Sequence, residues 1–185
     1  MNTFETLKSS FSVNWGTIFV GWEGLGKFSP FRWEDFPPLL TLDEVYEYCY
    51  DAIAKTDSKE EISLIIDLLE FENRSPDRAL VRSLLQPLAK LVPNETAFEL
   101  RKWRVIMLDE ILAQLKSNVV DDLAALSEFW MYFGFPPDSP MKFQGIDNNI
   151  CPEEFYTDEN HKQAVAANKV WVQREKQEIK QNRGR

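Results

Sequence analysis

The sequence predicts an all-α fold, a multi-helix bundle of antiparallel helix hairpins around a central buried helix. Apolar residues recur at helical spacing in several segments, so that each segment has one apolar face. Most of these segments begin at a residue that favours a helix N-cap. The chain has 185 residues, of which 44% are hydrophobic and only 7 are glycine, and such a chain can bury a core without disulfides or metals. We therefore expect a single domain over residues 1–185.

Residues 1–40 are rich in aromatic side chains, and we expect them to form a flap that closes one end of the core. Asn14 is a good N-cap for a short helix that ends at Gly24 or Gly26. Ser29-Pro30 can open a second short turn. The alternative is an exposed aromatic anchor for a partner, because tryptophan dominates many interface hot spots. The tryptophans concerned are Trp15, Trp22 and Trp33.

A helix hairpin is predicted from residue 41 onward. Thr41 with Glu44, and Ser58 with Glu61, each match the capping box, in which two side chains satisfy backbone amides at a helix start. In the first helix, the residues expected to face the core are Leu42, Val45, Cys49 and Ile53. In the second helix, they are Ile62, Ile65, Ile66 and Leu69.

The outer side of this hairpin carries the predicted partner-binding site. Asp43, Glu47 and Asp51 follow one another at i,i+4 positions beside Tyr50, with no local lysine to offset their repulsion. Residues 43–72 contain ten acidic residues and two lysines, a net charge of −8. A face that is merely solvated is the alternative. We call the predicted site the acidic surface, and it comprises Asp43, Glu47, Tyr50, Asp51, Asp57, Glu60, Asp67 and Glu70.

The central helix is expected over residues 94–116, with Asn94 as its N-cap, after a helix that Ser75-Pro76 opens and Pro87 kinks or ends. Arg104 lies inside the apolar stripe of the central helix. A buried unpaired guanidinium is prohibitively costly, so Arg104 must reach solvent, a carboxylate from a neighbouring helix or a bound anion. We expect a structural ion pair. The stripe comprises Leu100, Trp103, Met107, Ile111 and Leu115, widened by Val105, Leu108 and Leu112.

Two more helices are predicted, joined by a long loop. Residues 119–133 form the first, which Gly134 ends, and the loop over 134–156 is expected to wrap the core or carry function. Thr157 can cap the long C-terminal helix over 158–181, whose half-polar seam favours wet docking against the bundle over a coiled coil with a second chain. In the first helix, Leu123, Leu126, Trp130 and Phe133 are expected to face inward, and Asp121, Asp122 and Glu128 are not. The seam comprises His161, Val165, Asn168, Val172, Glu175 and Ile179.

The charge of the chain argues for a basic partner. The formal net charge is −9, and residues 169–185 carry +4 of their own, so residues 1–168 carry −13. Such a body disfavours unassisted binding to nucleic acid. No stretch approaches the roughly 20 apolar residues of a membrane span, and the first residues lack a secretory signal. We expect a cytoplasmic protein, without membrane contact and monomeric when free.

The residues that catalysis most often needs are scarce. His161 is the only histidine, and neither Cys49 nor Cys151 is near it in sequence or spaced as a metal pair. No zinc-ligand cluster and no phosphate-binding loop is present in the sequence. We therefore expect no enzymatic activity, no metal and no cofactor. A carboxylate-only hydrolase or a small-molecule-binding helical domain, with its pocket around Arg104, stays open as an alternative.

Three short segments carry a resemblance to a known class of proteins. They are NWGTIFVGW, RKWRVIML and LSEFWMYFGFPPDSPMKF. In this order they resemble small all-helical bacterial proteins found beside polymorphic or contact-dependent toxins, which are taken to be immunity proteins. The resemblance implies neutralisation of a cognate toxin and transfers no functional residue.

Charge and resemblance together suggest how the protein acts. Many bacterial toxin domains are basic nucleases, and an acidic partner binds them quickly through electrostatic steering. We expect an immunity protein that neutralises such a toxin by stoichiometric binding through the acidic surface. A helical adaptor or scaffold that binds a host partner is the alternative. Exclusive pairing with one cognate toxin would separate the two.

Overall fold

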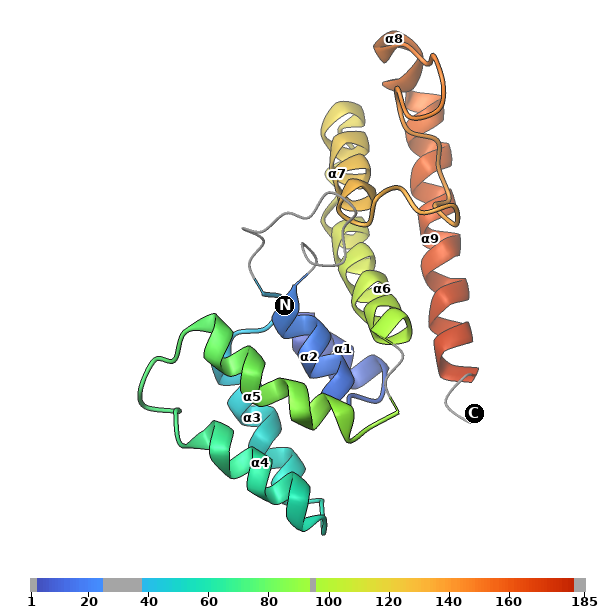
Figure 1. Cartoon of the computed structure of the whole chain (residues 1–185). Coiled ribbons are helices and arrows are strands. Elements are labelled where there is room, and N and C mark those ends of the chain that lie inside the picture. Colours follow the sequence, from blue (N-terminus) through green and yellow to red (C-terminus); the bar gives the residue numbers. More distant parts are fainter. Residues whose placement is uncertain (1–2, 25–37, 94–95, 182–185) are drawn as a thin grey trace. The chain divides into compact units, whose positions relative to one another are not determined.

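The structure is a computed structural model that describes residues 3–24, 38–93 and 96–181 (Figure 1). These residues contain nine helices and no strand, which confirms the all-α prediction. The helices are α1 (Thr3–Ser10), α2 (Trp15–Glu23), α3 (Leu42–Ile53), α4 (Lys59–Leu69), α5 (Arg78–Lys90), α6 (Thr96–Gln114), α7 (Val119–Tyr132), α8 (Pro152–Phe155) and α9 (Asp158–Gln181).

The described residues divide into two compact units. Residues 3–24, 38–93 and 96–103 belong to the N-terminal unit, and residues 104–181 belong to the C-terminal unit. The division falls within α6, the predicted central helix. The prediction of one domain stays a prediction, because a division by contacts does not show whether the units unfold together. Each unit is described by itself.

In the N-terminal unit, α5 packs against α2 and α4, and α4 packs against α3 (Figure 1). Helix α2 starts at Asn14, whose side chain accepts from the amide of Thr17 in a capping box, and it ends at Gly24, where φ is 72°. Both bounds agree with the sequence prediction. The fully buried side chains of this unit include Leu7, Ile18, Leu40, Val45, Ile65, Leu68, Leu85 and Trp103.

Helix α1 was not predicted, yet it belongs to this core. Phe4 and Leu7 are fully buried, and the ring of Phe4 stacks on Trp103 with 6.3 Å between centroids. Trp103 also donates a hydrogen bond of 3.0 Å from Nε1 to the carbonyl oxygen of Thr17. Helix α2 lies directly on this indole, because a Cβ at Gly21 would collide with Trp103 and come within 2.9 Å of Leu40.

A buried ion pair joins α6 to the residues that precede α2. Glu99 and Lys102 are each 2% exposed, and the Lys102 ammonium lies 2.7 Å from the Glu99 carboxylate. Lys102 also donates to the carbonyl oxygen of Ser12 at 3.0 Å. The Glu99 carboxylate accepts from the hydroxyl of Thr17 and, at 3.3 Å, from the side-chain amide of Asn14. These bonds satisfy both charges, which makes the burial of the pair tolerable.

Two predictions for α4 and α5 are wrong, and one of the two effects predicted for Pro87 is excluded. Ile66 is 47% exposed, and Leu68 is buried in its place, because the face that meets α3 and α5 is centred on Ile65. Helix α5 begins after Asp77, whose side chain accepts from the amide of Leu80, and Ser75 instead has φ of 45°. Pro87 lies inside α5 and the helix continues to Lys90, so Pro87 does not end the helix, and the predicted kink stays a prediction.

The second predicted capping box is only half formed. Ser58 is the N-cap of α4 and accepts from the amide of Glu61 at 3.3 Å. The Glu61 carboxylate does not return this bond. It accepts from Nε1 of Trp15 at 2.7 Å and from the hydroxyl of Thr56 at 2.6 Å. A contact between distant parts of the chain has replaced the local one.

In the C-terminal unit, α7 packs against α9 (Figure 1). The predicted seam of α9 faces inward, since Asn168, Val172, Glu175 and Ile179 are buried. Its polar positions have partners within the chain, because Asn168 accepts from Nε1 of Trp130 at 2.8 Å. Helix α7 ends as predicted before Gly134, where φ is 71°.

Asp122 was predicted to lie off the inward stripe of α7, and this is wrong. It is 3% exposed and accepts from the amide of Lys116 at 3.0 Å, and Nε2 of His161 lies 2.9 Å from its other oxygen. Burial raises the pKa of Asp122, but the hydrogen bonds from Lys116 and His161 outweigh burial, so the pKa lies below its usual value. Helix α9 supplies the partner that makes this burial tolerable.

Candidate partner-binding surface

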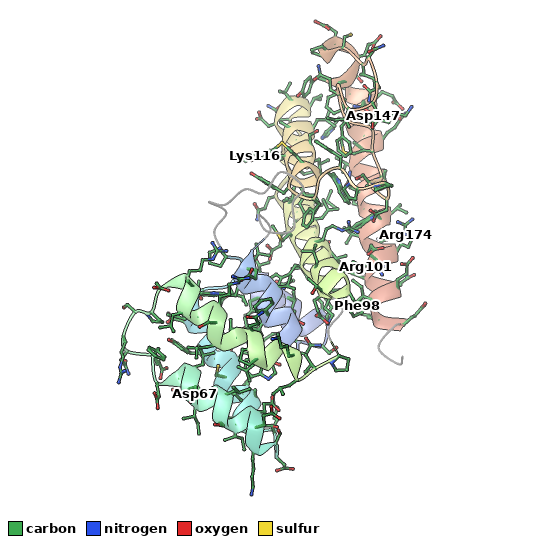
Figure 2. All side chains as sticks on the ribbon, in the orientation of Figure 1. Asp67, Phe98, Arg101, Lys116, Asp147 and Arg174 are labelled. Carbon is green, nitrogen blue, oxygen red and sulfur yellow. The ribbon has the colours of Figure 1, made fainter. Side chains whose placement is uncertain are left out.

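The residues of the acidic surface lie on α3, on α4 and next to α4, in the N-terminal unit. Asp43, Glu47, Tyr50 and Asp51 on α3 are exposed, and so are Asp57, Glu60, Asp67 and Glu70. Figure 2 labels Asp67 on α4. All eight predicted residues are therefore open to a partner.

Local chemistry fixes the helix that carries four of these residues. Thr41 is the N-cap of α3, and the Glu44 carboxylate accepts a hydrogen bond of 2.7 Å from the Thr41 amide. This is the predicted capping box. Val45, Tyr46 and Cys49 are buried on the opposite side of the helix. Because the helix is held at its start and along its buried side, the exposed side stays turned to solvent.

Two residues of the acidic surface, Glu47 and Tyr50, have partners that the sequence does not predict. Glu47 pairs with Lys8 of α1 at 2.6 Å, so a lysine from a distant part of the chain supplies a counter-charge that no local lysine supplies. Lys8 also pairs with Glu5 at 2.5 Å, and these bonds outweigh the effect of burial and raise the pKa of Lys8. Tyr50 donates to the Glu72 carboxylate at 2.5 Å, which raises the pKa of its phenol. Glu47 and Tyr50 are therefore held in place by groups outside the predicted site.

The other members of the acidic surface have no ion pair within the part of the chain that the structure describes. They are Asp43, Asp51, Asp57, Glu60, Asp67 and Glu70. Exposed carboxylates without counter-charges produce a negative potential that attracts cations. Two large apolar side chains on the same two helices are also exposed, Ile66 at 47% and Tyr50 at 49%. A mixture of apolar contacts and charges is typical of protein interfaces.

The aromatic N-terminal segment is the other predicted contact surface. Trp15 is 2% and Trp22 is 6% exposed. Trp15 packs edge-on against Tyr48 at 4.8 Å, and Nε1 of Trp22 donates to the carbonyl oxygen of Arg78 at 3.2 Å. These two tryptophans are core residues and not an exposed anchor. Trp33 and the predicted Ser29-Pro30 turn lie outside the described residues, as does the predicted N-cap Asn94.

Arg104 in the C-terminal unit has the ion pair that was predicted for it. Its guanidinium lies 2.7 Å and 3.4 Å from the two carboxylate oxygens of Asp138, which belongs to the loop after α7 and not to a neighbouring helix. The guanidinium carbon also lies 4.8 Å from the ring centre of Trp171, 5.7 Å from Trp130 and 5.9 Å from Phe133. Asp138 and three aromatic faces therefore surround this charge.

The histidine and the two cysteines that were considered for catalysis differ in burial and in contacts. His161 is bound to the buried carboxylate of Asp122. Cys49 is fully buried, and burial raises the pKa of its thiol to about 12. Cys151 is half-buried in the loop before α8. Among residues 3–24, 38–93 and 96–181, no group of three or more histidine, cysteine, aspartate or glutamate side chains could hold a metal ion.

Comparison with models of known protein families identifies the family of this chain. The family model described as an uncharacterized protein conserved in bacteria (DUF2247) matches residues 4–176. The chain belongs to this family. No curated protein matches it, and no solved structure matches it. The family therefore shows a bacterial lineage.

The structure also shows two contacts of the acidic surface that the sequence did not indicate. Lys8 and Glu72, which hold two residues of the acidic surface, are 39 and 22 positions from their partners. No local pattern could have paired them.

None of the helices in the described parts of the chain is both long and apolar enough to cross a membrane.

Proposed function

We propose that this protein is an immunity protein, which acts in the bacterial cytoplasm by binding a basic toxin domain of the nuclease class through its acidic surface. The observation that carries the proposal is the group of six exposed carboxylates on and beside α3 and α4 that form no ion pair with any described residue. Family membership supports a bacterial setting. The resemblance of the three aromatic segments to immunity proteins supports the class.

The physical argument concerns the energy of like charges. Exposed carboxylates three or four positions apart on a helix, such as Asp67 and Glu70, repel one another by a few tenths of a kcal/mol per pair. A basic partner removes this repulsion and replaces it with attraction, which speeds association and selects against acidic partners. Ile66 and Tyr50 supply apolar area within the same surface, so binding does not rest on charge alone.

The first test is co-expression with the C-terminal segment of the protein encoded immediately upstream in the source genome, which is scored for toxicity. Rescue of growth, together with a one-to-one complex that weakens at high salt, is the expected result. Unrelieved toxicity and no complex would overturn the immunity proposal. Formation of complexes with several host proteins and none with the toxin would favour the adaptor alternative.

The second test locates the contact. Glu60→Lys with Asp67→Lys reverses two exposed charges that lie seven positions apart on α4. We expect this double variant to bind the toxin at least about tenfold more weakly at low salt, because each reversal replaces an attraction with a repulsion. Glu47 is a poorer choice, since its reversal would place a lysine beside Lys8.

A matched control is present on another helix. Asp121→Lys with Glu128→Lys changes the net charge equally, at exposed positions that are also seven apart, on α7. This variant should retain most of the affinity. Equal losses for both double variants would show that net charge matters and that the acidic surface is not the contact.

A further inference from the structure

The C-terminal unit contains a cavity of about 410 Å³, bounded by the loop after α7, by α8 and by the first half of α9. This volume lies within the range of small-molecule sites, roughly 300–1,000 Å³. The cavity is separate from the surroundings of Arg104, where sequence analysis placed the alternative small-molecule pocket, because Arg104 does not line it. Its apolar lining includes Met141, Ile150, Phe155, Ala164 and Ala167.

The walls of the cavity are held in place by bonds within the loop. Asn148 donates to the carbonyl oxygens of Phe143 at 2.7 Å and Ile146 at 2.5 Å, and its own side-chain oxygen accepts from the amide of Ile150 at 3.1 Å. The side-chain amide of Asn168 contacts the sulfur of Met141 at 3.4 Å. These bonds hold Ile150 and Met141, two of the loop residues that line the cavity, and so reduce the ordering that a ligand would have to impose.

The side of the cavity formed by α9 is made of small residues. Ala164 is buried, and Ala167 is half-buried one helical turn later. Larger side chains at these positions would fill the space, because positions three apart lie on one helix face. Ala166, by contrast, is exposed and does not line the cavity.

The polar atoms left for a ligand are mostly acceptors. Asn160 donates through its side-chain nitrogen to Phe155 at 2.7 Å, and Gln163 donates to Glu159 at 2.5 Å. The amide oxygens of Asn160 and Gln163 accept no bond from the residues that the structure describes. Glu154 adds a carboxylate, of which one oxygen accepts from the amide of Cys151 at 3.3 Å.

One cation complements these acceptors. Lys142 lines the cavity, is exposed, and has no ion pair among the described residues. A ligand ammonium is suited to the Glu154 carboxylate and the two amide oxygens, and a ligand carboxylate is suited to Lys142. The apolar lining suits an aliphatic or aromatic side chain.

We propose that this cavity binds a free α-amino acid with an apolar side chain, through Glu154 and the amide oxygens of Asn160 and Gln163 on its ammonium and Lys142 on its carboxylate. The proposal does not depend on toxin binding. A ligand with only one of the two charged groups leaves the opposite protein charge without its partner, so the zwitterion should bind best.

The test is calorimetric titration of the full chain with L-leucine, L-methionine and L-phenylalanine up to about 10 mM, which detects millimolar dissociation constants. We expect saturable binding of at least one of them. Leucinamide, which lacks the carboxylate, and N-acetyl-L-leucine, which lacks the ammonium, should bind about tenfold more weakly or not at all. An absence of binding by all three amino acids overturns the proposal, and binding of either derivative as tightly as L-leucine overturns the assigned ligand class.

Matched variants locate the site. Ala167→Met should fill the cavity and abolish binding, and Ala166→Met, at the neighbouring exposed position of α9, should leave it unchanged. Glu154→Gln should weaken binding about tenfold, because glutamine can still cap α8 but carries no charge. Lys142→Gln should weaken binding to a similar extent, because it removes the charge proposed for the ligand carboxylate. Retained binding in Ala167→Met, with melting unchanged, overturns the location.

Discussion

Two sets of carboxylates in this protein have opposite surroundings. Glu99 and Asp122 are buried, and each is held by a cation or ring and by further donors. Glu60 and Asp67 are exposed and have no ion pair in the described parts of the chain. The first set is committed to the fold, because its partners lie inside the chain. The second set is free to meet a partner, and its mutual repulsion contributes nothing favourable to folding.

The comparison predicts effects of different size on stability and on binding. Removing one charge of a buried pair leaves the other without compensation. Removing an exposed charge changes little, since water already solvates it. Substitutions of the buried carboxylates should therefore lower the free energy of unfolding much more than substitutions of the exposed ones. Equal losses in the two sets would contradict the comparison.

The largest effect is expected at Glu99. Glu99→Gln keeps the size of the side chain but leaves the buried Lys102 ammonium without its counter-charge. We expect a loss of about 3–5 kcal/mol in the free energy of unfolding. Urea unfolding followed by tryptophan fluorescence measures it. A loss below about 1 kcal/mol would mean that Lys102 is neutralised in another way.

A smaller effect is expected at Asp138. Asp138→Asn removes the carboxylate that pairs with Arg104, while the three aromatic rings still surround the guanidinium. We expect a loss of about 1–2 kcal/mol, because Asp138 itself is partly exposed. Asp147→Asn in the same loop is the control, since asparagine tolerates the φ of 54° found there. Equal losses for both variants would assign the effect to the loop and not to the ion pair.

The next effect depends on pH. The pKa of Asp122 is below its usual value, so its ionised form stabilises the folded state above the ordinary carboxyl pKa of about 4, and this stabilisation is lost as the pH falls through the lower folded value. We expect Asp122→Asn to cost about 1–2 kcal/mol at neutral pH and progressively less below about pH 4. Unfolding curves over this range test it. Asp121→Asn is the control, because it makes the same substitution at the exposed neighbouring position.

The smallest effect is expected within the acidic surface. Asp67→Asn should leave the melting temperature unchanged within about 2 °C, or raise it slightly, because it removes repulsion without removing a contact. Thermal unfolding at low salt is the most sensitive measurement. A clear loss of stability would show that Asp67 has a partner within the chain and belongs with the buried set.

Local signals account for the parts of the fold that were predicted correctly. Asn14 and Thr41 cap their helices through neighbours three residues on, so the sequence contains both partners. The exposed side of α3 follows from helical spacing alone. Helix α1 was missed because eight residues with few apolar positions give a weak periodic signal.

Contacts between distant residues account for the errors. Ser75 and Asp77 are both good N-caps, and only the path of the chain before α5 selects Asp77. Asp122 is buried because His161, 39 positions away, is placed beside it by α9. The cavity is another such case, since no local pattern shows how the loop lies on α9.

The rates at which the two thiols react with a reagent report separately on the two units. Cys49 is fully buried in the N-terminal unit, with a thiol that stays protonated at neutral pH, whereas Cys151 is half-buried in the loop of the C-terminal unit. A maleimide reagent should therefore modify Cys151 first and reach Cys49 only when the N-terminal unit opens. The slow step of modification then measures how often the helices that carry the acidic surface come apart, without an engineered residue.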